Sequence, residues 1–195
     1  MDASTRGTAL HLHIEQFLNK YPFEDDSVEF NQFLEFKEDY QHLEPFRTEL
    51  VVFDERLRIA GSIDMLYRDP QTDELWIYDW KRSKEFKHSN KWQSGIGILG
   101  HLDDCNIAHY SLQLNLYEHI LKTHYNVKIA GKCLVRCHPN LSTYERFVVP
   151  DMSHEISMIL DNRYKELYGT NNIPQTVNNT PESEDEDECA FSDSD

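Results

Sequence analysis

The sequence predicts an α/β domain with one mixed sheet that begins with an antiparallel three-strand meander and is flanked by helices. Three strand-like runs follow one another in the first half of the chain, joined by the short links "ER" and "DPQTD". Turn residues in short links favour antiparallel neighbours. Helical patterns precede, separate and follow the strand-like runs, which suggests one sheet with helices on both faces. With 195 residues, 39% of them hydrophobic, the chain is long enough for one such domain.

The N-terminal half supplies two helical segments and the meander. Residues 8–20 repeat apolar side chains at helical spacing, and Pro22 ends the pattern. The acidic and aromatic segment 24–44 is also expected to be helical. The expected strands are residues 48–54, 57–68 and 74–81.

The C-terminal half supplies one long helix, two strands and a last helix. Residues 85–105 contain "GIGILG" and are expected to form a loop or a mobile helix. The remaining predicted elements are a helix over 106–125, strands over 128–137 and 144–150, and a helix over 153–169. The folded domain is expected to span residues 1–174, and residues 175–195 are predicted to form a disordered acidic tail.

Charge is unevenly distributed along the chain. The net charge is −16, and residues 182–195 contribute eight acidic residues and no basic one. Residues 81–91, "KRSKEFKHSNK", have five basic residues and one acidic residue, so they form a possible phosphate-facing surface or a solvated loop. No apolar run is long enough to cross a bilayer, and the N-terminus lacks the order of a signal peptide. We expect an intracellular protein, in cytoplasm or nucleus, with no membrane partner.

Three charged residues interrupt the predicted strands in "GSIDMLYRDPQTDELWIYDWKRSK", namely Asp64, Asp79 and Lys81. A hairpin that pairs Arg68 with Leu75 would also place Asp64 opposite Asp79. Two facing carboxylates repel each other, but a divalent cation between them reverses the sign, because Mg²⁺ and Mn²⁺ prefer oxygen ligands. The alternative is a structural ion pair between Asp79 and Lys81.

Two helical segments carry further candidates. Gln113 and Tyr117 are four residues apart and share a helix face, although such a tyrosine is often a core residue. His11 and Glu15 have the same spacing in the first helix. An imidazole ligand suits Mn²⁺ better than Mg²⁺, but a helical histidine is more often a surface or core residue.

Four segments in order, "GTALHLHIEQFL", "GSID", "DWK" and "QLNLY", resemble the PD-(D/E)xK nuclease superfamily, and within it the RecB-like exonuclease branch. The resemblance covers about residues 7–150. It implies a restriction-endonuclease-like core and a metal-dependent nuclease, with Mg²⁺ or Mn²⁺ as cofactor. Some relatives hold an iron–sulphur cluster with one cysteine before the first motif. No cysteine precedes His11 here, so we expect no cluster.

The resemblance also implies roles for individual residues. Lys81 would be the catalytic lysine that acts on the attacking water, and Gln113 and Tyr117 would support the site or contact the nucleic acid. The implied metal ligands are His11, with His13 as its competitor, the carboxylates of Asp64 and Asp79, and the backbone carbonyl of Trp80. Glu49 aligns with an acidic residue of less certain role.

The implied substrate is DNA with single- or double-stranded ends, with RNA as an alternative. The residues expected to track the strand are Arg82, Lys84, Lys87, Lys91, Trp92, Gln113 and Tyr117. A helicase or another replication or repair protein is a possible partner. Stand-alone versions of this domain, without an attached helicase motor, look common in phages and large DNA viruses, so a viral origin is possible.

Several functions stay open at this point. We expect a DNA exonuclease; the alternatives are a structure-specific endonuclease or an RNase of the same fold, and a non-catalytic nucleic-acid-binding module. The acidic tail is expected to aid solubility; the alternatives are that it competes with nucleic acid for the site or binds a basic partner.

Overall fold

The computed structural model describes residues 3–169, so the predicted acidic tail at 175–195 lies outside the described residues. The elements in chain order are α1 (Ala3–Leu18), α2 (Val28–Asp39), β1 (Glu44–Asp54), β2 (Ile59–Asp69), β3 (Glu74–Lys81), the 3₁₀ helix η1 (Gly97–Leu99), α3 (Asn106–Tyr125), β4 (Ile129–Arg136), β5 (Glu145–Val148) and α4 (Ser153–Tyr168). Among these residues, no helix has both the length and the apolar character needed to span a membrane.

The five strands form one mixed sheet in the order β1-β2-β3-β4-β5. Strands β1, β2 and β3 are antiparallel neighbours, β4 joins β3 in parallel, and β5 returns antiparallel to β4. The parallel step occurs across α3, which links β3 to β4 and thus serves as the crossover helix. The predicted mixed sheet with an antiparallel meander is confirmed.

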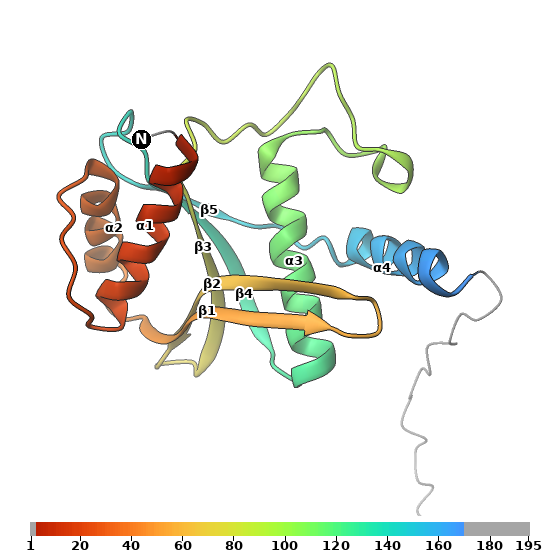
Figure 1. Cartoon of the computed structure of the whole chain (residues 1–195), viewed down its shortest axis with the longest axis horizontal. Helices are drawn as coiled ribbons and strands as arrows, with labels where there is room; N and C mark the ends of the chain where they lie inside the picture. The colour runs from red at the N-terminus through yellow and green to blue at the C-terminus, as the bar shows by residue number, and fades with distance from the viewer. Residues whose placement is uncertain (1–2, 170–195) are drawn as a thin grey trace, which may run out of the picture.

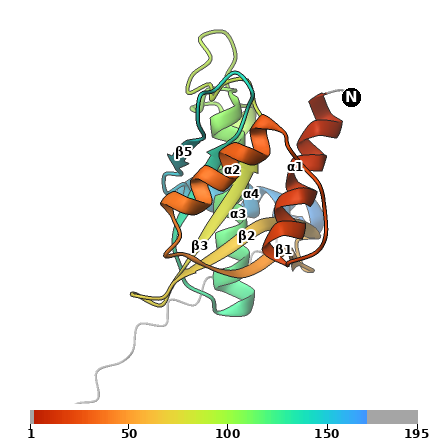
Figure 2. The ribbon, with the colours of Figure 1, turned by 90° about the vertical axis from the view of Figure 1, so that its left-hand side faces the viewer.

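Helices cover both faces of the sheet, and β3 shows why. Its alternate residues Trp76, Tyr78 and Trp80 pack with α1 and α2, whereas Leu75 and Ile77 pack with α3. A strand buried on both faces needs an apolar residue at nearly every position. Figures 1 and 2 show α1 and α2 on one side of the sheet and α3 on the other.

The helix ends differ from the predicted ones for local reasons. Helix α1 begins at Ala3, so the segment 8–20 is only its later part. Helix α2 begins after Ser27, whose hydroxyl accepts a hydrogen bond from the N–H of Phe30 at 3.2 Å. The acidic residues before Ser27 therefore remain outside the helix. Residues 85–105 are mostly irregular, as the prediction of a loop requires, and contain the short helix η1.

Candidate metal centre and active site

The site lies where β2 and β3 separate. The two strands pair from Asp69↔Glu74 to Met65↔Tyr78, in the predicted register. Beyond that pair, β2 continues only with β1, and β3 continues only with β4. The expected direct pairing of Asp64 with Asp79 is therefore wrong. The carboxylate of Asp64 instead accepts the backbone N–H of Trp80 at 2.9 Å, which takes the place of the next ladder bond.

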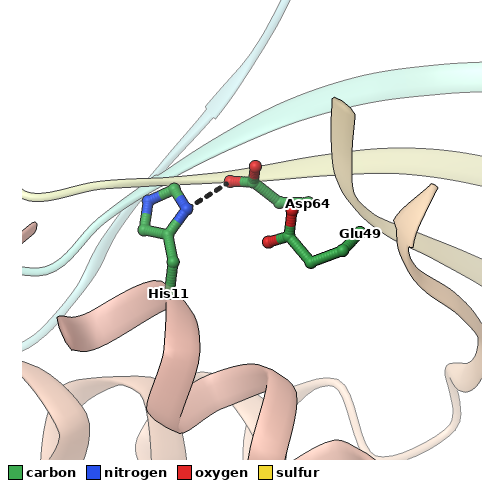
Figure 3. A group of neighbouring side chains, drawn as sticks. All are labelled: His11, Glu49 and Asp64. Atoms are coloured by element: carbon green, nitrogen blue, oxygen red, sulfur yellow. Dashed lines mark ion pairs between the residues drawn. The ribbon is translucent and has the colours of Figure 1, made fainter. Parts of the chain in front are cut away.

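Three side chains converge at this fork. His11 from α1, Glu49 from β1 and Asp64 from β2 each offer a ligand atom, and these atoms lie within 4.8 Å of one another. Figure 3 shows the imidazole and the two carboxylates pointing toward a common space. One imidazole nitrogen and two carboxylates form a donor set that suits Mn²⁺ well, and the carboxylates also suit Mg²⁺.

Glu49 joins the group because its backbone leaves the regular strand conformation. Its φ is +43°, a region that costs an ordinary L-residue roughly 1 kcal/mol or more. The ladder pairs on either side are Thr48↔Met65 and Leu50↔Ile63, so Glu49 stands opposite Asp64 without a ladder bond. Burial raises the pKa of Glu49, a hydrogen bond from Ser62 opposes that effect, and the nearby Asp64 carboxylate adds to it.

His11 is oriented by the backbone of Trp80. Its Nε2 lies 2.7 Å from the carbonyl oxygen of Trp80, and a carbonyl only accepts, so Nε2 carries the hydrogen. Its Nδ1 then faces Asp64 at 3.3 Å. Burial alone would lower the pKa of His11, but the carboxylates of Asp64 and Asp79 outweigh burial and raise it. A neutral His11 would present the Nδ1 lone pair to a cation shared with Asp64.

Asp79 and Lys81 form a nearly buried pair beside this group. The ammonium of Lys81 donates to Oδ1 of Asp79 at 3.0 Å and lies 2.7 Å from Oδ2 at an angle unsuitable for a hydrogen bond. Oδ2 therefore has no hydrogen-bond partner among the described residues. Burial, reinforced by the charge of Asp64, raises the pKa of Asp79 to about 7. A buried carboxylate oxygen that accepts no hydrogen bond and contacts a single ammonium fits a site for a divalent cation.

Lys81 remains charged in this setting. Burial lowers its pKa, but the carboxylate of Asp79 outweighs burial, and the pKa is raised. The ammonium also lies 4.6 Å from the ring centroid of Tyr110 on α3, a distance typical of a cation–π contact. Tyr110 was missed by the sequence reasoning, although it precedes Gln113 by one helical turn and thus lies on the same face.

Gln113 and Tyr117 support the site from behind. The amide of Gln113 donates to the hydroxyl of Tyr117 at 2.9 Å, and Tyr117 is a core residue, 7% exposed. A Cβ atom at Gly61 would lie 2.4 Å from the ring of Tyr117. The glycine of "GSID" therefore allows the close approach of the tyrosine of "QLNLY". Burial favours support over nucleic-acid contact for Tyr117.

Two sequence candidates lie away from the group. His13 contacts Asp25 at 2.5 Å and stacks on Phe23, so His11 rather than His13 faces Asp64. The guanidinium of Arg82, expected on the nucleic-acid surface, instead forms a buried ion pair with Glu29 at 2.6 Å. Arg82 is thus placed where it ties the end of β3 to α2.

The other residues of the basic stretch are exposed. Lys84, Lys87, Lys91 and Trp92 lie on the surface of the connection between β3 and α3, and Trp92 is 93% exposed. At the candidate metal centre itself, α1 and β1 border a groove of about 430 Å³, and His11 and Glu49 line it.

The comparison with protein families assigns the chain. A family model described as the PD-(D/E)XK nuclease superfamily matches residues 26–191. The chain belongs to the PD-(D/E)XK nuclease superfamily. Its five-stranded mixed sheet between helices is the restriction-endonuclease-like fold that the sequence predicted. The match begins after α1 and therefore does not include His11.

Two solved structures resemble the chain in outline. A crystal structure described as a "Putative exonuclease" from Eubacterium rectale has a TM-score of 0.47 and 8% identity, and the match covers 83% of this chain and 64% of that one. A structure of a protein named SSO0001 has a TM-score of 0.40 and 16% identity, with 90% of this chain and 64% of that one covered. The chain thus spans about 64% of the length of both. No curated protein matches it.

Proposed function

We propose that this protein is a divalent-metal-dependent exonuclease of the RecB-like branch that hydrolyses phosphodiester bonds at DNA ends. The observation that supports the proposal best is the convergence of His11, Glu49 and Asp64 next to the Asp79–Lys81 pair. A structural ion pair between Asp79 and Lys81 would not require the unfavourable φ of Glu49 on the neighbouring strand β1.

The residues that would hold the metal are His11, Glu49, Asp64, Asp79 and the carbonyl of Trp80. When bound there, Mg²⁺ or Mn²⁺ would act as a Lewis acid on the phosphodiester and lower the pKa of a water molecule. The carbonyl of Trp80 accepts a hydrogen bond from Nε2 of His11 at 2.7 Å. The imidazole makes Mn²⁺ the better fit of the two ions.

Lys81 would orient the attacking water and stabilise the negative charge that develops on the phosphate. Its raised pKa keeps it protonated, so it acts as a hydrogen-bond donor and a positive charge rather than as a base. Water would add to phosphorus and release a proton to solvent, while the bond from phosphorus to the leaving sugar oxygen breaks and that oxygen takes up a proton from solvent. Gln113 and Tyr117 would keep the strand of Asp64 in place through Gly61.

A partner that delivers the DNA end is part of this proposal. The net charge of −16 opposes non-specific attraction to DNA, whose affinity for proteins depends on contacts between basic residues and phosphates. A helicase or another replication or repair protein could supply that attraction.

The test is cleavage of end-labelled linear DNA, single- and double-stranded, beside a closed circle and an RNA, with Mg²⁺ or Mn²⁺. Parallel reactions contain EDTA or the variant Lys81→Ala. The matched control is Lys128→Ala, which removes an exposed lysine at the start of β4 that forms no ion pair with any described residue.

An exonuclease degrades linear DNA only, and both EDTA and Lys81→Ala abolish the reaction while Lys128→Ala does not. Cutting of the circle would make the protein an endonuclease, and cleavage of RNA alone would make it an RNase. If the folded wild type cleaves none of these, the site is a metal or nucleic-acid binding site without catalysis.

A further inference from the structure

The connection between β3 and α3 carries a small lobe, residues 90–104, with large apolar side chains in solvent. Trp92 and Ile96 are each 93% exposed, and Ile98 is 42% exposed. Isolated exposed apolar residues are ordinary, but three within seven residues of one lobe are an unusual concentration of exposed apolar side chains. Figure 1 shows this connection extending over the end of α3 and out toward α4.

The lobe is held in shape by its own hydrogen bonds. The N–H of Gly95 donates to the carbonyl of Leu102 at 2.8 Å, and the side chain of Asn90 donates to the carbonyl of Asp104 at 2.7 Å. Asp103 accepts the N–H of Asn90 at 3.0 Å. A Cβ atom at Gly95 would lie 2.4 Å from a backbone oxygen, so the turn needs glycine there. These hydrogen bonds therefore define the backbone conformation in which the apolar side chains are exposed.

Exposed lysines lie in the segment that leads into the lobe. Lys84 and Lys91 are exposed and form no ion pair within residues 3–169, whereas Lys87 pairs with the exposed Glu85 at 3.3 Å. The acidic residues of the lobe are engaged, because Asp103 accepts from Asn90 and Asp104 pairs with His109 at 2.7 Å. Exposed cations beside an exposed indole match a single nucleic-acid strand, with its phosphates and its unpaired bases.

We propose that the 90–104 lobe binds the unpaired bases of the DNA strand whose end occupies the active site, so that the substrate is DNA with a single-stranded end. Trp92 stacks on a base, Ile96 and Ile98 cover the neighbouring base faces, and Lys84 and Lys91 contact the phosphates. This inference rests on the proposed nuclease function and specifies the substrate class of the same site.

The chain itself limits the distance between lobe and active site. Trp92 follows Lys81 by eleven residues, so the two lie within roughly 40 Å of each other at ~3.5 Å per residue. At about 3.4 Å per nucleotide, a strand that leaves the active site spans that distance in a dozen nucleotides or fewer. The preference for single strands should therefore depend on the length of the overhang.

Binding is tested without cleavage, in EDTA, by the fluorescence of Trp92. Trp80 is buried and Trp76 is partly buried, so an aqueous quencher reaches Trp92 first. We expect a single-stranded 20-mer to protect Trp92 from iodide and a blunt duplex not to do so. Trp92→Ala should weaken single-strand binding by roughly 5- to 100-fold. The control Tyr21→Ala, which removes an exposed aromatic residue between α1 and α2, should leave it unchanged.

Cleavage is then measured on duplexes with overhangs of increasing length, in Mn²⁺. Trp92→Ala should slow cleavage only when the overhang is long enough to reach the lobe. Equal protection of Trp92 by blunt duplex, or unchanged binding by Trp92→Ala, would overturn the proposal. Since the binding assay needs no metal, loss of cleavage with intact protection of Trp92 would contradict the nuclease function while supporting the lobe.

Discussion

Two successive cations at the end of β3 have opposite surroundings, although each pairs with a carboxylate. Arg82 and Glu29 meet at 2.6 Å with side-chain exposures of 8% and 10%. Beside them, Gln32 bonds to the carbonyl and the N–H of His138, so the polar groups of this corner are satisfied. Lys81 and Asp79 meet at 2.7 Å with exposures of 17% and 3%, and one oxygen of Asp79 has no hydrogen-bond partner among the described residues.

The difference separates a structural ion pair from a functional one. Burial of charge is tolerated where buried polar atoms find partners, and no buried side-chain atom of Arg82, Glu29 or Gln32 lacks a hydrogen bond among the described residues. The Lys81 pair has an oxygen of Asp79 that contacts the ammonium without a hydrogen bond, and the pair lies next to His11, Asp64 and the unfavourable backbone of Glu49. Both cations stand side by side in the sequence "DWKR", which does not tell them apart, so substitutions must distinguish the two pairs.

The largest effect is expected from Lys81→Ala. Loss of the ammonium removes the charge that stabilises the developing phosphate oxyanion, and single-turnover cleavage should slow by about 10³-fold or more. The circular dichroism spectrum should remain native, because Asp79 can take up a proton when its partner is lost. A rate within about threefold of the Lys128→Ala control would make the Asp79–Lys81 pair structural after all.

Arg82→Met should show the reverse pattern. The change leaves Glu29 buried without its partner, and urea denaturation should reveal a loss of roughly 3–5 kcal/mol in the free energy of unfolding. The control Arg68→Met breaks an exposed pair with Glu44 and should cost less than about 1 kcal/mol. Cleavage by folded Arg82→Met should stay near the wild-type rate. Weaker DNA binding at unchanged stability would restore Arg82 to the nucleic-acid surface.

Much of the fold could be predicted because its signals are local. Helix α3 and strand β3 have the predicted limits, since α3 repeats apolar residues at helical spacing and short turns bound β3. The register of the β2–β3 hairpin also follows from a short connection and the alternation along both strands. Apolar spacing did not reveal the first turns of α1, where Thr5, Arg6 and Gly7 provide no apolar stripe.

The structure brings several of the predicted site residues close together, in a geometry that the sequence did not show. Spacing brought His11, Asp64, Asp79 and Lys81 together as candidates. No pattern of residue types shows that Glu49 takes a positive φ, because that depends on the whole strand pairing around it. The Arg82–Glu29 pair joins residues 53 positions apart, and composition alone assigned Arg82 to the exposed basic stretch.

Stability of the metal-free protein should fall as pH rises from about 4 to 7. The pKa of Asp79 is raised from its ordinary 3.8 to about 7, so the folded state binds more protons than the unfolded state in that window. Urea denaturation in EDTA at pH 5, 6, 7 and 8 measures this. The free energy of unfolding of the wild type should fall by about 2 kcal/mol over this range, and Asp79→Asn should abolish that fall. Parallel curves for both proteins would show that Asp79 is ionised throughout.

The smallest effect is expected at Tyr110, whose ring contacts the ammonium of Lys81 at 4.6 Å. Tyr110→Leu removes the cation–π contact but keeps an apolar side chain, and single-turnover cleavage should slow by roughly 2- to 30-fold. Tyr110→Phe retains the ring, so this variant should cleave at nearly the wild-type rate. If both variants slow cleavage equally, the hydroxyl matters rather than the ring, and Lys81 is held by Asp79 without help from Tyr110. If neither variant slows cleavage, the ion pair with Asp79 alone positions the ammonium of Lys81, and the reaction does not depend on its contact with α3.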